Sequence, residues 1–206
     1  MPASNTYIAQ APFHSGLKQM TTTASYFEIQ CPDNDGYWAE DASNLCAVCK
    51  SKLRRDVWNA DFSLKKTQYD LSITYDGFYI ASEKFRALID QPGRAGVSFR
   101  LLPSKKKYLD NFYLVDLNNV VSVDIERAQP EIGPECGACG QCTYVVGAVG
   151  YFLSEQVAEN DLVRTDLQFG DGFEKHFVML AGRQLARDLN LARLNGCYLS
   201  LVEAQS

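Results

Sequence analysis

The sequence predicts an α+β protein in which two similar strand–helix–strand units, with mostly antiparallel sheet, are joined by a four-cysteine site. Three observations support this prediction: short alternating apolar segments are separated by turn residues, one stretch is echoed 100 residues later, and two CxxC pairs are present. We divide the 206 residues into an irregular N-terminal segment with the first pair (1–60), a first unit (61–130) and a second unit with the second pair (131–206). The three segments are expected to form one compact domain.

Composition places the chain among globular proteins. Apolar residues make up 46% and aromatic residues 12%, which is too apolar for a disordered chain. No stretch reaches the roughly 20 apolar residues of a bilayer span, and the N-terminus lacks the pattern of a secretory signal. We therefore expect a cytoplasmic protein without a membrane partner. The net charge of −5 argues against a role that depends on a global positive field for holding phosphates.

Strand signals begin near the N-terminus. Residues 24–31 predict a strand, which a dense cluster of turn residues follows. The pattern becomes more regular from residue 69 onward, where 69–75 and 78–80 predict two strands around the favoured turn pair Asp76-Gly77. These strands open the first unit.

A short helix and further strands complete the first unit. Ser82 is suited to an N-cap, and apolar residues at helical spacing predict a helix that ends before Pro92. Alternation over 97–101 predicts a half-buried strand. The apolar runs within 112–125 are interrupted at Asn118-Asn119, which predicts a hairpin there.

The second unit is predicted from an internal echo. Residues 80–102 align without gaps on residues 180–202, and both copies have the pattern of a strand end, a short helix, a glycine and an alternating strand. Gly96 aligns with Gly196, where a chain that leaves a helix needs a permissive backbone. We interpret the echo as a structural duplication, with two unrelated pieces of similar length as the alternative.

Four of the seven cysteines form two CxxC pairs, Cys46 with Cys49 and Cys136 with Cys139. Two such pairs complete a tetrahedral metal site, because each lies in a tight turn whose backbone amides point at the sulfurs. We therefore predict a structural zinc ion held by these four residues. Because 86 residues separate the pairs, the site would connect distant segments. Structural zinc in small modules contributes on the order of 10 kcal/mol of folding free energy.

Other interpretations of the cysteines stay open. Cys142 extends the second pair to CxxCxxC, which suits an iron–sulfur cluster with Cys46 or Cys49 as the fourth ligand. Either pair could instead be a redox dithiol, or the thiols could be buried without a ligand. Cys31 and Cys197 lie in strand-like apolar sequence and are interpreted as core residues. Cys142 has no assigned role.

The sequence offers little material for catalysis. The two histidines, His14 and His176, are each interpreted as structural or solvent-exposed. Asp116, Asp124 and Glu126 alternate along strand-like sequence and are expected on the wet face of a sheet. No glycine-rich phosphate loop, metalloprotease motif or nucleophile elbow occurs. We therefore expect no enzymatic activity.

Two basic clusters suggest an alternative function. The lysines at 105–107 are interpreted as a solvated loop. The second cluster follows the first CxxC pair and consists of Lys50, Lys52, Arg54 and Arg55. It suits a zinc-ribbon protein that binds nucleic acid or has a regulatory role, although a solvated loop is the simpler interpretation. A redox or metal-dependent enzyme is a third possibility.

The pair of CxxC knuckles resembles the double-CxxCG immunity proteins of bacterial polymorphic toxin systems. In that family the second knuckle is followed by a D-L-F-R type segment, a strand, a short helix, a glycine and a final strand. The matching residues here are 161–164, 177–180, 185–189, Gly196 and 198–202. The middle segment, with FYIASEKFRALID, is similar to related immunity proteins. The resemblance covers roughly residues 40–206, with two departures: Lys50 replaces the glycine of the first motif, and Cys142 is extra.

The resemblance implies a non-enzymatic antidote, which is a cytoplasmic protein of the toxin-producing cell. Such a protein binds a cognate toxin or effector domain and blocks its active site, with no membrane or nucleic-acid partner. This role needs a rigid scaffold with a complementary surface rather than catalytic residues. An acidic binder is also steered towards a basic toxin such as a nuclease.

Overall fold

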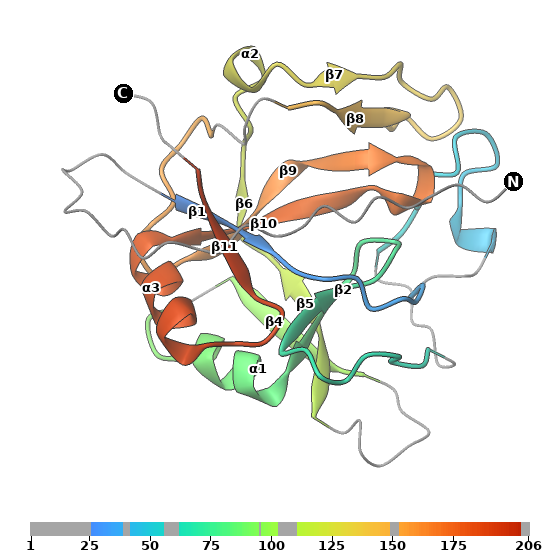
Figure 1. The fold of residues 1–206 in the computed structure, drawn as a ribbon. Helices are drawn as coiled ribbons and strands as arrows, with labels where there is room; N and C mark the ends of the chain where they lie inside the picture. Colours follow the sequence, from blue (N-terminus) through green and yellow to red (C-terminus); the bar gives the residue numbers. More distant parts are fainter. Residues whose placement is uncertain are drawn as a thin grey trace, which may run out of the picture.

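The computed structural model describes residues 26–38, 42–55, 62–94, 96–102, 111–148 and 153–202 (Figure 1). The predictions for His14 and for the lysines at 105–107 lie outside the described residues. None of the helices in these ranges has the length and apolar character needed to cross a membrane.

Short strands dominate the described chain. The strands are β1 (Tyr26–Gln30), β2 (Leu71–Ile73), β3 (Tyr79–Ser82), β4 (Val97–Leu101), β5 (Phe112–Leu117), β6 (Val120–Val121), β7 (Glu131–Ile132), β8 (Tyr144–Val146), β9 (Leu162–Asp171), β10 (His176–Gly182) and β11 (Tyr198–Val202). The helices are α1 (Glu83–Ile89), α2 (Ile125–Ala128) and α3 (Arg183–Ala192), with single 3₁₀ turns η1 (Ala42–Asn44) and η3 (Gly172–Glu174).

The strands form two sheets. One has the order β11-β1-β10-β9-β8-β7, with β6 paired to β9, and the other has the order β2-β3-β5-β4. Neighbouring strands are antiparallel except for β6 and β9, which are parallel. The predicted α+β class with mostly antiparallel sheet is therefore confirmed.

Both predicted strand–helix–strand units form, and each is part of a larger repeat. The first repeat consists of the β2–β3 hairpin, α1 and β4, with β5 between β3 and β4. The second repeat consists of the β9–β10 hairpin, α3 and β11, with β1 between β10 and β11. The hairpins share a register, since Leu71 faces Ala81 in one and Leu162 faces Ala181 in the other.

The inserted strands reach their places by different routes. In the first repeat β5 follows β4 along the chain, and Tyr113 faces Leu101. In the second repeat β1 comes from the beginning of the described chain, and Tyr26 faces Val202 at the end of β11 (Figure 1). The first repeat has a chain connection between β4 and β5. At the equivalent place, between β11 and β1, the second repeat has its two ends. Circular permutation of one repeat would produce this relation.

The duplicated helices begin with different residues. The Ser82 hydroxyl accepts a hydrogen bond from the Phe85 N–H (3.3 Å), which confirms the predicted N-cap of α1. Gly182 occupies the equivalent position before α3 and makes no side-chain cap. A Cβ at Gly182 would lie 1.9 Å from the Ala158 carbonyl oxygen, so the close backbone approach requires glycine there.

The glycines that follow the two helices have the predicted permissive conformation. Gly96 has φ of 84° and Gly196 has φ of 79°. Each also packs closely against a neighbouring segment. A Cβ added at Gly96 would lie 2.0 Å from the Asn119 side chain, and one added at Gly196 would lie 2.5 Å from the Leu71 carbonyl oxygen. The echo therefore corresponds to equivalent backbone paths.

The predicted hairpin at Asn118-Asn119 is wrong. After β5 the chain leaves its sheet, and β6 pairs with β9 of the other sheet, with Val120 facing Arg164. Gly96 fixes this change of direction, since its carbonyl accepts from the Asn118 N–H (2.7 Å). The expected wet sheet face is also wrong for Asp124, whose carboxylate caps α2, and for the neighbouring Glu126 within that helix.

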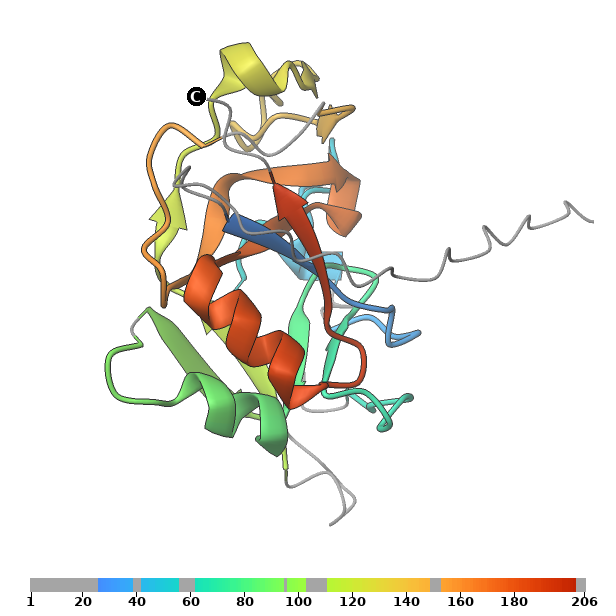
Figure 2. The ribbon, with the colours of Figure 1, turned by 60° about the vertical axis from the view of Figure 1, so that its left-hand side comes forward.

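One core joins the two repeats. It takes buried side chains from both sheets and from both α1 and α3, including Phe85, Ile89, Leu185 and Leu189. Figure 2 shows the two helices side by side. Two further clusters cover the other faces of the sheets, one around Trp38 and one around Leu180 of β10. Strand alternation allows this, because successive side chains of each strand enter different clusters.

Candidate metal centre

The first knuckle spans residues 45–52, which fold back so that Leu45 bridges Lys52. The Cys46 N–H donates to the Ser51 carbonyl (2.9 Å), and the Lys50 N–H donates to the Cys46 carbonyl (3.0 Å). These bonds form the tight turn expected for a CxxC pair.

The second knuckle spans residues 135–142 and has the same plan. Glu135 bridges Cys142, the Cys136 N–H donates to the Gln141 carbonyl (2.9 Å), and the Gly140 N–H donates to the Cys136 carbonyl (2.8 Å). The two knuckles therefore have equivalent backbone hydrogen bonds.

The residue after each CxxC pair has a left-handed backbone. Gly140 has φ of 73° and Lys50 has φ of 61°. Glycine adopts this conformation without steric cost, whereas lysine is strained by about 1–2 kcal/mol. The Lys50 ammonium donates to the Ala47 carbonyl within the same turn (3.1 Å). The departure from the CxxCG motif thus leaves the turn geometry intact.

The two knuckles meet and bring the four predicted sulfurs together. The four Sγ atoms lie within 4.8 Å of one another. Cys46 Sγ is 3.8 Å from Cys136 Sγ, and Cys49 Sγ is 3.5 Å from Cys139 Sγ. Ligand bonds of 2.3 Å in a tetrahedron would separate sulfurs by about 3.8 Å, so the cluster has the dimensions for one metal ion. Four cysteines of the described chain can therefore hold a metal.

Hydrogen bonds within the first knuckle favour the thiolate form of its two cysteines, whereas burial and the neighbouring thiols raise the pKa of Cys139 in the second knuckle to about 12. Hydrogen bonds from the Cys49 and Val48 N–H groups lower the pKa of Cys46. The Ser51 hydroxyl, 3.2 Å from Cys49 Sγ, is the largest cause that lowers the pKa of Cys49 to about 6. Because metal ligands must be deprotonated, these donors assist metal binding.

The other cysteines lie outside this cluster. Cys142 is partly buried against the core around Leu180, and its sulfur is not among the clustered four. Cys31 and Cys197 are partly buried against the core shared by the two repeats, in agreement with their interpretation as core residues. Burial raises the pKa of Cys197 to about 12 and raises that of Cys31 as well, which leaves both as unreactive thiols.

Two buried lysines connect the knuckles to the β9–β10 hairpin. The Lys52 ammonium donates to the carbonyls of Asp76 (2.7 Å), Lys175 (2.9 Å) and Phe173. The Lys175 ammonium donates to the Cys142 carbonyl of the second knuckle (2.6 Å). The knuckles are also linked directly, because the Gln141 amide donates to the Lys52 carbonyl (2.8 Å).

The first knuckle leads into a cavity that the sequence did not predict. Arg55 lies between the rings of Phe78 and Phe177, with its guanidinium carbon 4.7 Å and 5.0 Å from their centroids. Its Nη2 donates to the Gly77 carbonyl (2.7 Å). Arg55 lines a cavity of about 480 Å³ together with Arg164 and other residues, which we call the arginine cavity.

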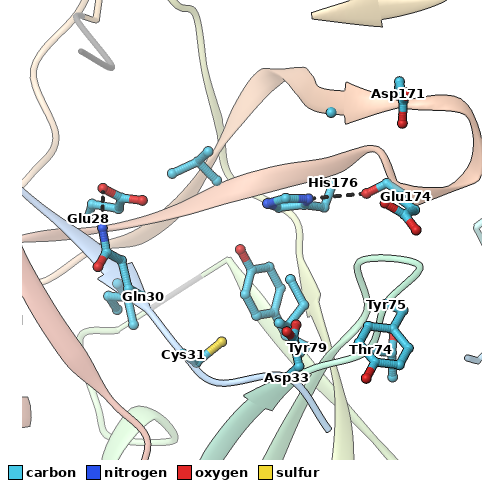
Figure 3. A pocket seen from close by; sticks show the side chains of 14 residues that line it. Glu28, Gln30, Cys31, Asp33, Thr74, Tyr75, Tyr79, Asp171, Glu174 and His176 are labelled. Atoms are coloured by element: carbon cyan, nitrogen blue, oxygen red, sulfur yellow. Dashed lines mark hydrogen bonds between the residues drawn. The ribbon is translucent and has the colours of Figure 1, made fainter. Parts of the chain in front are cut away.

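A second cavity, of about 430 Å³, lies on the other side of β10 and is called the acidic cavity. Figure 3 shows its carboxylates, which belong to Glu28, Asp33, Asp171 and Glu174. His176 also lines it, with Nδ1 3.2 Å from the Glu174 carbonyl oxygen. Burial lowers the pKa of this imidazole, so the residue is neutral at neutral pH.

Comparisons with known proteins add no assignment. No protein-family model matches the sequence, and no curated protein matches it.

Proposed function

We propose that this chain is a zinc-clamped immunity protein, which neutralises a cognate toxin domain by binding it and blocking its active site. The two knuckles meet at one four-sulfur cluster, and this observation supports the proposal most strongly. The resemblance to the immunity family depends on this pair of motifs. The protein acts without catalysis.

Zinc suits the donor set. Four thiolates fill every position of a tetrahedral ion, and no position is left for water or substrate, which is typical of structural zinc. An iron–sulfur cluster would place several irons and sulfides between the cysteines and hold their sulfurs further apart than 3.5 and 3.8 Å. The ion therefore clamps the segment before the first repeat to the segment before the second.

An aromatic and acidic surface beside the clamp suits a basic partner. The Tyr37 ring lies 5.2 Å from Tyr75 and 5.6 Å from Phe173, centroid to centroid. Tyr75 also lines the acidic cavity and is 38% exposed. Exposed aromatic rings are typical anchors of protein interfaces, and the adjacent carboxylates would receive a lysine or arginine of the toxin.

The nucleic-acid alternative loses its strongest residues. Lys52 is buried and donates hydrogen bonds to three carbonyls, and Arg55 lies between two aromatic rings. Neither side chain is part of an exposed basic strip that could follow a phosphate backbone. The predicted cluster of four basic residues is therefore not one solvated loop.

Sequencing the genes beside this one and, where one encodes a toxin-like domain, co-expressing that domain with this chain tests the proposal. The chain should restore growth and bind the purified toxin domain in isothermal titration calorimetry. A toxin that kills equally with and without this chain would contradict the immunity role.

A matched pair of tyrosine variants tests the surface. Tyr75→Ala should weaken toxin binding by about tenfold or more, because an exposed aromatic anchor is lost. Tyr198→Ala removes a tyrosine that is 49% exposed on β11 and should leave the affinity unchanged. Equal effects of the two variants would reject this surface while leaving the immunity role open to the growth test.

A further inference from the structure

The arginine cavity gathers positive charge between the two sheets. Three guanidinium groups line it, from Arg55, from Arg100 of β4 and from Arg164 of β9. Among the described residues that line it, the one carboxylate belongs to Asp116 of β5. It is paired with Arg100, whose Nε and Nη2 donate to its two oxygens (2.7 and 3.2 Å). The described lining therefore carries an excess of two positive charges, although the whole chain carries −5.

The other two arginines have no carboxylate partner within the described residues. Arg55 donates to the Gln168 side chain (3.4 Å) and to the Gly77 carbonyl (2.7 Å). Arg164 donates to the carbonyls of Leu117 (3.0 Å) and Thr165 (3.2 Å). Each guanidinium has five N–H donors, so each retains donors for a ligand.

Both unpaired cations are partly desolvated. The guanidinium carbon of Arg164 lies 3.9 Å from the centroid of Phe177, the ring that also contacts Arg55. Burial lowers the pKa of Arg55 to about 10, so the group remains charged at neutral pH. Burying a charge is costly, and although Asp76 and Asp116 stabilise the charge of Arg55 and Asp166 stabilises that of Arg164, an anion in the cavity would offset more of that cost.

We propose that the arginine cavity binds a dianionic phosphate group, either as free phosphate or as a phosphate monoester. Two guanidinium forks match a phosphate in both charge and geometry, because each presents parallel N–H donors. The apolar lining by Phe78, Phe177 and Leu117 provides room for an organic portion. This inference does not depend on the proposed immunity function.

Calorimetric titration of the full chain with inorganic phosphate, AMP and adenosine tests the proposal, in a buffer of low salt and without phosphate. Phosphate and AMP should bind at one site, and adenosine should not. Tighter binding of AMP than of phosphate would identify a monoester as the ligand, whereas equal affinity would identify the free anion. The affinity should fall as salt is added.

Three variants locate the site. Arg164→Gln should weaken phosphate binding by about tenfold to a hundredfold, which is the range for a charged hydrogen-bonding group. Arg187→Gln makes the same change at an exposed position on α3 and should have no effect. Asp116→Asn removes the competing carboxylate and should tighten binding by about three- to tenfold.

Asp116→Asn keeps the test decisive if Arg164→Gln fails to fold, which circular dichroism would reveal. A purely structural role of these residues predicts no gain of affinity in any variant. The proposal is overturned if neither phosphate nor AMP binds at low salt, if Arg164→Gln folds and binds normally, or if Asp116→Asn does not strengthen binding.

Discussion

The two repeats reach the same arrangement by different chain routes. The first is complete within β2 to β5, whereas the second, from β9 to β11, needs β1 from the beginning of the described chain. The inserted strand, β5 in one repeat and β1 in the other, is therefore held in its place by pairing with a strand on each side and not by its order along the chain. In the second repeat, β1 begins 150 residues before its partner β10. This repeat therefore cannot form completely until most of the chain is present.

The repeats also extend beyond the echo in the sequence. A knuckle precedes each one, and the paired cysteines are 90 residues apart, close to the 91 residues between Leu71 and Leu162. Equivalent positions share a backbone conformation but carry different residues. Ser82 corresponds to Gly182, and Lys50 corresponds to Gly140. The duplicated feature is thus a backbone path, and the metal centre lies where the two copies meet.

Removal of one clamp ligand should have the largest effect. Cys136→Ser should abolish metal binding and lower the free energy of unfolding by several kcal/mol, towards the order of 10 kcal/mol that structural zinc contributes. Chemical denaturation with and without added zinc measures this loss. Cys142→Ser is the matched control, because its sulfur is outside the cluster, and it should behave like the wild type. Equal stability of the two variants would show that no clamp exists.

Truncation of the shared core should have the next largest effect. Phe85→Ala and Leu185→Ala change equivalent, fully buried positions of α1 and α3, and each should cost about 2–5 kcal/mol. Because one core contains both residues, each variant should unfold in a single transition. Urea unfolding followed by tryptophan fluorescence and by far-UV circular dichroism checks this. Two separate transitions would mean that the repeats are independent domains.

Circular permutation tests the relation between the repeats directly. A short linker from Val202 to Tyr26, with new ends between Leu102 and Asn111, would make the second repeat contiguous and the first one interrupted. Since Val202 already faces Tyr26, the permutant should keep the fold and lose less stability than the core variants. Thermal unfolding and metal content measure this. A permutant that is unfolded with zinc present would contradict the exchange of roles between β1 and β5.

Substitutions at the left-handed positions of the knuckles, Lys50 and Gly140, should change the free energy of unfolding by a small amount, with opposite signs in the two knuckles. Lys50→Gly should stabilise the chain by about 1 kcal/mol, and Gly140→Lys should destabilise it by about the same amount. Denaturant midpoints of the two zinc-loaded variants measure the difference. If both variants shift stability in the same direction, the knuckles are not equivalent in backbone strain.

The sequence predicts features whose signals are local. The Ser82 cap, the glycines at 96 and 196 and the strands next to them follow from capping, backbone conformation and alternation over a few residues. The CxxC pairs likewise define their own turns. Equivalent local signals 100 residues apart are therefore enough to predict the duplicated unit.

Pairing between distant strands could not be predicted in this way. Alternation shows that a strand exists but not which edge it joins, so it predicts neither the pairing of β6 with β9 nor the partners of β1. The burial of Lys52 and Arg55 is not predictable from the sequence for a similar reason. The carbonyls that receive Lys52 and the rings that enclose Arg55 belong to the β2–β3 turn and to the end of the β9–β10 hairpin.

The metal content of the purified chain tests the central claim most directly. Elemental analysis of protein prepared without chelator should find about one zinc per chain in the wild type and in Cys142→Ser, and none in Cys136→Ser. A folded wild-type chain that contains no metal after zinc has been supplied would contradict the clamp. A brown chain with several irons and sulfide would contradict its assignment to a single zinc ion.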